Sequence, residues 1–250
     1  MFRANDWALP RFAHIPLIHG ADGAKLSKRH GAVSVLEFRE QGFLPEALCN
    51  YLLRLGWGHG DAEILDRDAA IALFDLDGVG RAASRMDYAK LTHLNAHYMR
   101  LADDDRLTAE VVARLAVTAE SVVARIRMLM PGQKERARTM VELAASAAFL
   151  TKTVPLSFDA KAQALLTGEA CALLGQIAES LAGTDFSVEQ IDAALRALAE
   201  SIGKKLGQIA QPIRAALTGS TVSPPIDATL AALGREEALA RIAAARGGSL

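Results

Sequence analysis

The sequence is poor in cysteine, in long hydrophobic runs and in net charge. Its only cysteines, Cys49 and Cys171, lie in apolar, helix-like patterns, and two cysteines cannot build a disulfide framework or a four-cysteine zinc site. We therefore expect no structural zinc, and a reducing, cytoplasmic setting. No apolar run approaches the roughly 18–20 residues that a membrane-spanning helix needs, so we expect no membrane contact. Residues 1–12 also lack the apolar core of a secretory signal.

The near-neutral charge argues against a protein that coats nucleic acid. The net charge is −1 and the isoelectric point is 6.6, whereas the isoelectric point of nucleic-acid-coating domains is usually above about 9. We therefore expect no DNA partner. Basic residues nevertheless outnumber acidic ones in residues 1–31, 121–138 and 196–214. These stretches fit a localised contact with a polyanion, and the alternative is that they are ordinary solvated faces.

The pattern of apolar residues predicts a mainly α fold. Pro10 and Pro16 exclude a helix in that region, so residues 12–18 are interpreted as a short, partly buried extended segment. Beyond them, apolar spacings of three and four predict helices almost throughout. The expectation is a short mixed α/β segment followed by two α-helical modules.

Start and stop signals set the expected helix bounds. A helix over 45–56 begins at Pro45 and ends at Gly56, with one apolar stripe; its residues are Leu48, Tyr51, Leu52 and Leu55. Ser84 with Asp87 and Ser187 with Gln190 are interpreted as capping boxes that open helices.

Prolines define the remaining expected boundaries. Pro131-Gly132 is predicted to end a helix, and Pro212 to kink or restart one. Ser223-Pro224 is interpreted as the first turn of a helix. Residues 151–157, "TKTVPLS", are the strongest candidate for a linker.

One loop concentrates cations without a carboxylate among them. In "AKLSKRHG", Lys25, Ser27, Lys28 and Arg29 offer hydrogen-bond donors, and Gly23 and Gly31 allow close approach of the backbone to a bulky anion. Such a loop suits phosphoryl or nucleotidyl transfer, where catalysis is mostly positioning and charge stabilisation. Taken alone, a basic surface turn is the competing interpretation.

The surroundings of this loop resemble a known family. Residues 12–61 are similar to the region around the KMSKS-type motif of class I aminoacyl-tRNA synthetases, in its bacterial glutamyl form. Residues 84–100 resemble the family's helix that ends in L-N-x-x-Y-[IM]-R. Residues 203–226 and then 233–242 resemble the close of its anticodon-binding region. The resemblance to bacterial-type glutamyl-tRNA synthetases (glutamate–tRNA ligases) covers essentially the whole chain, and it is to their C-terminal half.

The resemblance implies a role for each residue of the loop. The motif would be Lys25, Leu26, Ser27, Lys28 and Arg29, closing over ATP while glutamate is adenylated. Lys28 would contact ATP directly and Lys25 would support the phosphates, so these two are the expected catalytic residues. Ser27 would order the loop and Leu26 would pack beneath it. Arg29 stands where other members of the class have serine. ATP as substrate and Mg²⁺ follow from the family.

The resemblance also implies tRNA as the partner. It gives residues 1–104 as the end of the catalytic region with the stem-contact fold, and 105–155 and 156–250 as two helical anticodon-binding modules. Because arginine can stack on splayed bases and bond their edges, Arg214 is the main expected tRNA-binding residue. Arg196, Lys204 and Lys205 are further candidates, with solvated helix charges as the alternative.

The family's nucleotide-binding half has no counterpart in these residues. We therefore expect a monomeric chain that does not charge tRNA alone, and whose activity requires a separate N-terminal half. A stand-alone tRNA-binding module and a purely structural helical bundle are the alternatives. Whether tRNA for glutamate, for glutamine or for both is cognate stays open. His93 and His97 lie four residues apart, but no third ligand is evident, so no metal site is expected.

Overall fold

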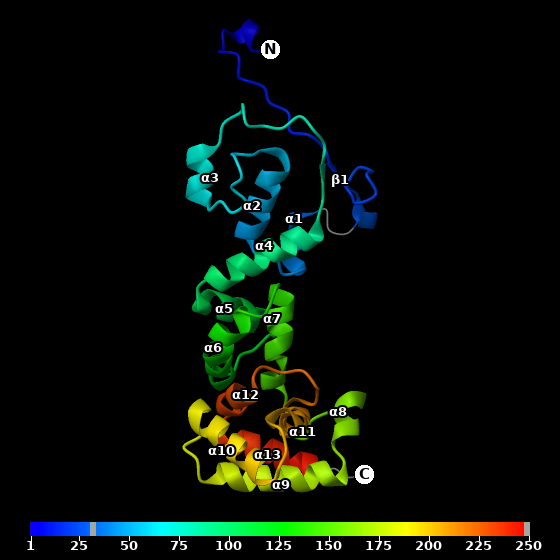
Figure 1. The fold of residues 1–250 in the computed structure, drawn as a ribbon. Coiled ribbons are helices and arrows are strands. Elements are labelled where there is room, and N and C mark those ends of the chain that lie inside the picture. The colour runs from blue at the N-terminus through cyan, green and yellow to red at the C-terminus, as the bar shows by residue number, and fades with distance from the viewer. Residues whose placement is uncertain (31–33, 248–250) are drawn as a thin grey trace. The chain divides into compact units, whose positions relative to one another are not determined.

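The structure, a computed structural model, describes residues 1–30 and 34–247. The chain divides into two compact units, Met1–Met99 and Arg100–Leu250. Helices dominate both units (Figure 1), and the only sheet among the described residues has two short strands. The prediction of a mainly α protein is confirmed.

The first unit surrounds a small parallel pair of strands. Ile18 of β1 pairs with Ser84 of β2, and His19 pairs with Arg85. The elements in chain order are η1 (Arg3–Asn5), β1 (Ile18–His19), η2 (Lys28–His30), α1 (Val35–Glu40), α2 (Pro45–Gly56), α3 (Arg67–Leu73), β2 (Ser84–Arg85) and α4 (Tyr88–Leu101).

The core of the first unit lies between α1, α2, β2 and α4. Its buried members are Phe38, Phe43, Leu48, Tyr51, Met86, Leu91 and Leu94. A buried amide fixes the start of α2, because Asn95 Oδ1 accepts a hydrogen bond of 2.7 Å from the Leu44 backbone N–H. The expected bounds of α2 are confirmed, but Leu52 on its expected apolar stripe is 38% exposed.

Two predictions for the first unit are wrong. Ser84 does not open a helix: it lies in β2, its hydroxyl donates to the Leu55 carbonyl, and α4 begins only at Tyr88. Strand pairing has replaced the capping role, while Asp87 Oδ1 accepts from Lys90 N at 3.0 Å in the first turn of α4. Most of the expected partly buried segment 12–18 is exposed, with Phe12 and Ile15 each 76% exposed, and only Pro16 and Ile18 are half-buried.

The second unit is entirely helical over its described residues. Its elements are α5 (Asp104–Arg114), α6 (Glu120–Lys134), α7 (Met140–Ala147), η3 (Ala148–Thr151), α8 (Ala160–Leu165), α9 (Gly168–Ala182), α10 (Val188–Ser201), α11 (Leu206–Thr218), α12 (Ile226–Leu233) and α13 (Arg235–Gly247). Ser187 caps α10 as predicted, accepting from Gln190 N at 3.4 Å.

Both interior prolines are accommodated within continuous helices. The predicted stop at Pro131 is wrong, because α6 runs on to Lys134, with Met130 and Gln133 buried on either side of the proline. Burial of these neighbours outweighs the one backbone hydrogen bond that a proline removes. At Pro212, where a kink or a restart was predicted, α11 is continuous from Leu206 to Thr218, which excludes the restart.

The expected cap at Ser223 is also wrong. The cap position of α12 is Pro225, and the Ser223 hydroxyl instead accepts from Arg214 Nε at 2.8 Å. Ser223 thus lies two residues before the cap position, and its hydroxyl binds Arg214 instead of the backbone of α12.

The linker-like residues 151–157 are held against the second unit. Lys152 Nζ donates to the Thr218 carbonyl at 2.7 Å, and Asp159 N donates to the Gly219 carbonyl at 2.9 Å. Gly219 has a φ of +72°, and a Cβ there would lie 2.2 Å from the Ser157 carbonyl oxygen. Only glycine satisfies both the left-handed conformation and this close approach.

A buried arginine joins three backbone segments of this unit. Arg241 of α13 is 1% exposed. Its guanidinium donates to the carbonyls of Phe149 (3.0 Å), Lys152 (2.6 Å) and Leu217 (2.7 Å), and its Nε to Glu237 at 2.8 Å. Burial lowers the pKa of Arg241 below its ordinary value, and Glu237 acts in the opposite direction.

None of the helices in the described residues combines the length and apolar character required to cross a membrane.

Replacing Arg241 tests this junction. Arg241→Met should destabilise the second unit by about 3–5 kcal/mol, because buried carbonyls lose their donor and Glu237 loses its partner. Urea unfolding followed by far-UV circular dichroism measures the change. Arg196→Met removes an exposed pair with Asp192 and should cost about 0.5 kcal/mol or less. Equal effects of the two variants would contradict the assignment.

Candidate functional site

The basic loop is a tight turn built on β1. Gly20 N donates to the Ala24 carbonyl at 2.8 Å, and Leu26 N donates to the Ile18 carbonyl at 3.0 Å, so the chain folds back on the strand. Gly23, with φ +79°, supplies the left-handed residue that the turn requires. Leu26 packs against the core of the first unit and so anchors the loop beneath its charged residues.

The charged residues of the loop differ in their surroundings. Lys25 and Lys28 are exposed, and Ser27 is half-buried. Arg29 Nη2 lies 3.4 Å from Asp22 Oδ2, so a carboxylate three residues before the motif partly neutralises its last cation. The two lysines are therefore the cations best placed to meet an external anion. Gly31, the second of the two glycines that flank the basic loop, lies outside the described residues.

A cavity of about 620 Å³ opens within the second unit, which is in the range of roughly 300–1,000 Å³ typical of ligand sites. We call it the inter-module cavity. One wall comes from the end of α6, α7 and η3, and consists of Gly132, Gln133, Arg136, Ala137, Glu142, Ala145, Ser146, Ala148, Phe149 and Lys152. The facing wall consists of Thr218, Ser220, Val222, Ser223, Pro224 and Pro225.

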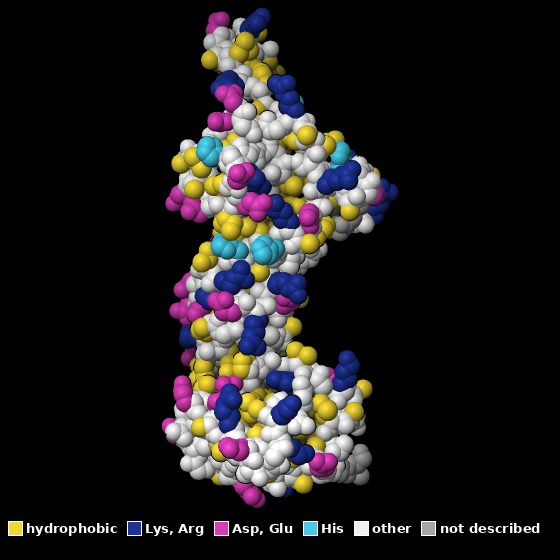
Figure 2. All heavy atoms as spheres, in the orientation of Figure 1, with side chains coloured by type: hydrophobic (Ala, Val, Ile, Leu, Met, Phe, Trp, Pro, Cys, Tyr) yellow, Lys and Arg dark blue, Asp and Glu magenta, His cyan; other side chains and the backbone are white. Residues whose placement is uncertain are grey.

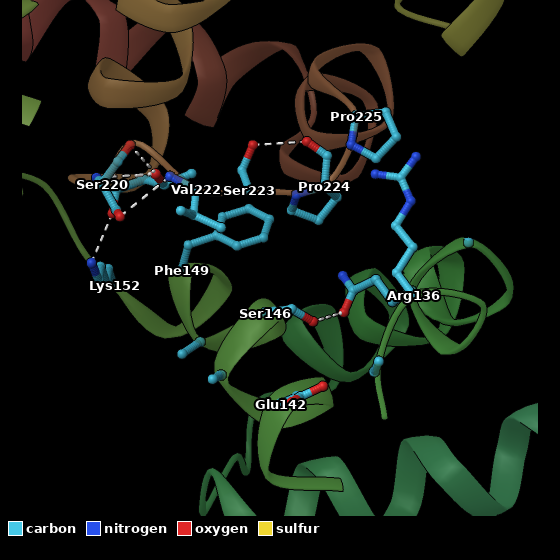
Figure 3. Close-up of a pocket in the computed structure, with 16 residues that line it drawn as sticks. Arg136, Glu142, Ser146, Phe149, Lys152, Ser220, Val222, Ser223, Pro224 and Pro225 are labelled. Atoms are coloured by element: carbon cyan, nitrogen blue, oxygen red, sulfur yellow. Dashed lines mark hydrogen bonds between the residues drawn. The ribbon is translucent and has the colours of Figure 1, made fainter. Parts of the chain in front are cut away.

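The two walls of the inter-module cavity differ in chemistry. Figure 3 shows Val222 and Pro224 on one side, with Phe149 and Arg136 on the other, and the Arg136 side chain reaching toward Pro225. Arg136 is exposed, and its guanidinium makes no ion pair with a described residue. The cavity thus combines apolar and aromatic surfaces with a cationic, planar donor.

Arg214 supports this cavity from behind its second wall. It lies on α11, is half-buried, and its Nε donates to the Ser223 hydroxyl, whose residue lines the cavity. Burial lowers the pKa of the Arg214 guanidinium below its ordinary value. The predicted residue is therefore adjacent to the cavity rather than part of its described lining.

The other three expected tRNA contacts lie apart from the inter-module cavity lining. Arg196 Nε is 2.6 Å from Asp192, which raises the pKa of that arginine. Lys204 is 2.8 Å from Glu169 and holds the pKa of that carboxyl below its usual value. Lys205 is exposed. On the face seen in Figure 2, Lys and Arg side chains are interspersed with Asp and Glu rather than gathered in one patch.

Sequence reasoning did not single out Arg136 or Gln133. The only hint of Arg136 in the sequence was its place in the basic stretch 121–138. That it lines a cavity together with residues 218–225 depends on long-range contacts, which the local sequence does not specify. Gln133 was placed beyond the expected end of a helix, and α6 in fact continues through it.

No three His, Cys, Asp or Glu residues within residues 1–30 and 34–247 form a group that could hold a metal ion.

Two family profiles match the chain one after the other. The family described as "tRNA synthetases class I (E and Q), catalytic domain" matches residues 1–93, and the family described as "Anticodon binding domain" matches residues 93–246. The change of family falls within α4, close to the boundary between the two compact units.

Named relatives agree with these profiles. Glutamate–tRNA ligase 1 of Gluconacetobacter diazotrophicus is 66% identical over 250 residues, covering 98% of this chain and 54% of the relative. Glutamate–tRNA ligase 1 of Granulibacter bethesdensis is 67% identical over 245 residues, covering 98% of this chain and 52% of the relative.

A solved structure agrees as well. The glutamate tRNA ligase of Elizabethkingia meningosepticum, in complex with its amino acid, is 30% identical, with a TM-score of 0.79 over 99% of this chain and 53% of its own. The chain spans about half the length of the relatives it matches. It therefore belongs to the anticodon binding domain family, joined to the end of a class I synthetase catalytic domain, and corresponds to the C-terminal half of glutamate–tRNA ligases.

Proposed function

We propose that the chain is the tRNA-reading half of a glutamate–tRNA ligase, which attaches glutamate to tRNA at the expense of ATP. The observation that carries this proposal is the identity of 66% to a glutamate–tRNA ligase over 98% of the chain. In this proposal the chain acts in the cytoplasm as a monomer, with a nucleotide-binding half that completes the active site.

Within this function, the basic loop serves the chemistry. The exposed Lys25 and Lys28 stand on a turn anchored by Leu26, and a lysine ammonium is suited to a phosphate charge that moves during reaction. Lys28 contacts ATP as glutamate is activated, and Lys25 supports the phosphates. Mg²⁺, which the family implies, would when bound supply positive charge against the phosphates of the nucleotide.

The inter-module cavity serves recognition. Splayed RNA bases are read by stacking on aromatic or guanidinium planes and by hydrogen bonds to their edges. Phe149 and Arg136 offer both within the cavity, and Arg214 holds Ser223 in the opposite wall. We assign the cavity to a base of the anticodon.

A stand-alone tRNA-binding module derived from such an enzyme is the less favoured function. Two exposed lysines would serve either function, because they can contact the phosphates of a nucleotide or of RNA. The profile of the catalytic domain over residues 1–93 favours the ligase.

Anticodon dependence tests the recognition role. The pure chain should bind tRNA transcripts for glutamate more tightly than transcripts with altered anticodons, measured by fluorescence anisotropy at two salt concentrations. Transcripts for glutamine, tested in parallel, identify the cognate. Arg214→Ala should reduce the preference about tenfold, because a charge-assisted hydrogen bond contributes roughly 1.5–3 kcal/mol.

The matched control for that experiment is Arg196→Ala. Arg196 carries the same charge but is paired with Asp192 away from the cavity lining, so its loss should weaken binding to all transcripts alike and reduce the salt dependence. Binding by the unaltered chain that ignores the anticodon would refute the recognition role.

Loss of Lys28 tests the catalytic role. The chain alone should show no glutamate-dependent ATP–pyrophosphate exchange. Joined to the N-terminal half of the Gluconacetobacter diazotrophicus ligase, it should gain that activity, and Lys28→Ala should lower kcat about 10²-fold through lost charge stabilisation. Lys161→Ala, an exposed lysine on α8, is the control. Equal kcat for the Lys28 and Lys161 variants would exclude the role.

A further inference from the structure

One buried amide side chain that lines the inter-module cavity is paired at one end only. Gln133 is 7% exposed and lines the cavity. Its Oε1 lies 2.5 Å from the Ser146 hydroxyl, a contact drawn as a dashed line from Ser146 in Figure 3. Its Nε2 has no hydrogen-bond partner among the described residues. Buried amides in folded proteins are nearly always paired, so this end of the side chain is an exception that a ligand would remove.

The helix geometry holds Gln133 in this place. Because α6 continues through Pro131 to Lys134, Gln133 stays on the same buried face as Met130 and Leu129. The side chain is therefore fixed by packing at one end and by Ser146 at the other. A group held in this way can contact a ligand with little loss of conformational freedom.

The single hydroxyl proton of Ser146 determines which end of the Gln133 amide faces the cavity. Its hydroxyl lies 2.7 Å from the Leu143 carbonyl oxygen as well as 2.5 Å from Gln133 Oε1, and one hydroxyl has one proton to donate. When the proton goes to Leu143, the favourable arrangement reverses the amide, so that Nε2 donates to Ser146 and Oε1 faces the cavity. The free end of Gln133 can thus present either a donor or an acceptor.

We propose that Gln133 is a specificity-determining residue of this chain, whose free amide end hydrogen-bonds the edge of an anticodon base in the inter-module cavity. The inference rests on the proposed function of the cavity. It extends that function, because Arg136 can only donate, whereas Gln133 can also accept. The Watson–Crick edge of a base offers both donors and acceptors, and so matches one side chain that donates and one that can also accept.

The test removes only the polar end of the side chain. Gln133→Leu should lower affinity for the cognate transcript about three- to tenfold, the value of one hydrogen bond. For the transcript altered at the base that Gln133 contacts, the same substitution should change affinity by less than about twofold. Such coupling between one residue and one base position is what a purely structural role does not produce. Gln133→Met repeats the test with a flexible side chain.

Two further variants sharpen the interpretation. Ser146→Ala removes the anchor and should reduce the preference at the same base position, with a smaller effect. Gln176→Leu, an exposed glutamine on α9 outside the cavity lining, should change nothing. The thermal unfolding temperature of Gln133→Leu should be no lower than that of the unaltered chain. The substitution removes a buried amide whose Nε2 has no partner among the described residues, so little hydrogen bonding is lost.

The possible results separate this inference from the proposed function. Anticodon preference in the unaltered chain, together with unchanged preference in Gln133→Leu, overturns the role of Gln133 and leaves the proposed function intact. Equal weakening of all transcripts by Gln133→Leu also overturns it. No anticodon preference in the unaltered chain overturns both. In ¹⁵N-labelled chain, the Gln133 side-chain amide resonances should shift with cognate RNA and stay unchanged with the altered transcript.

Discussion

The arrangement of the helical unit depends on the burial of one guanidinium. Arg241 has a single carboxylate partner, and its guanidinium makes three further hydrogen bonds, to the carbonyls of Phe149, Lys152 and Leu217. Phe149 and Lys152 belong to one wall of the inter-module cavity, and Leu217 directly precedes the other. A planar fork with fixed angles can hold three separate backbone segments at set distances, so the width of the cavity is determined from α13, which does not line it.

The cavity and the basic loop differ in the kind of ligand that each could bind. The loop presents point charges to solvent on a turn tied to the core by Leu26, an arrangement suited to an anion that arrives and leaves. The cavity combines apolar and aromatic surface with polar side chains, an arrangement suited to a planar ring with distinct edges. The loop lies within the match to the catalytic-domain family, and the cavity lies within the match to the anticodon-binding family.

Local signals in the sequence predicted local structure well. Pro45 and Gly56 bound α2, and Ser187 caps α10, because these residues act on their own backbone. Ser84, Pro131 and Ser223 behaved otherwise because distant partners (Leu55, the packing around α6, and Arg214) outweighed their local preferences. Arg214 could be proposed from family resemblance, but the cavity beside it joins residues 132–152 to 218–225, and nothing in the local pattern of either stretch specifies the other.

The pinned segment around Ser157 has a practical meaning for anyone who divides or labels this protein. Because residues 151–157 are mostly polar and contain Pro155, their composition alone would mark them as a linker suitable for proteolysis, for an inserted tag or for dividing the chain. Lys152 and Asp159 attach both ends of that segment to the turn at Thr218–Gly219, and Gly219 packs directly on Ser157. An added residue there would displace the turn that shapes one side of the cavity. The segment therefore holds the parts of the second unit together, and the unit should be kept whole when the protein is divided or labelled.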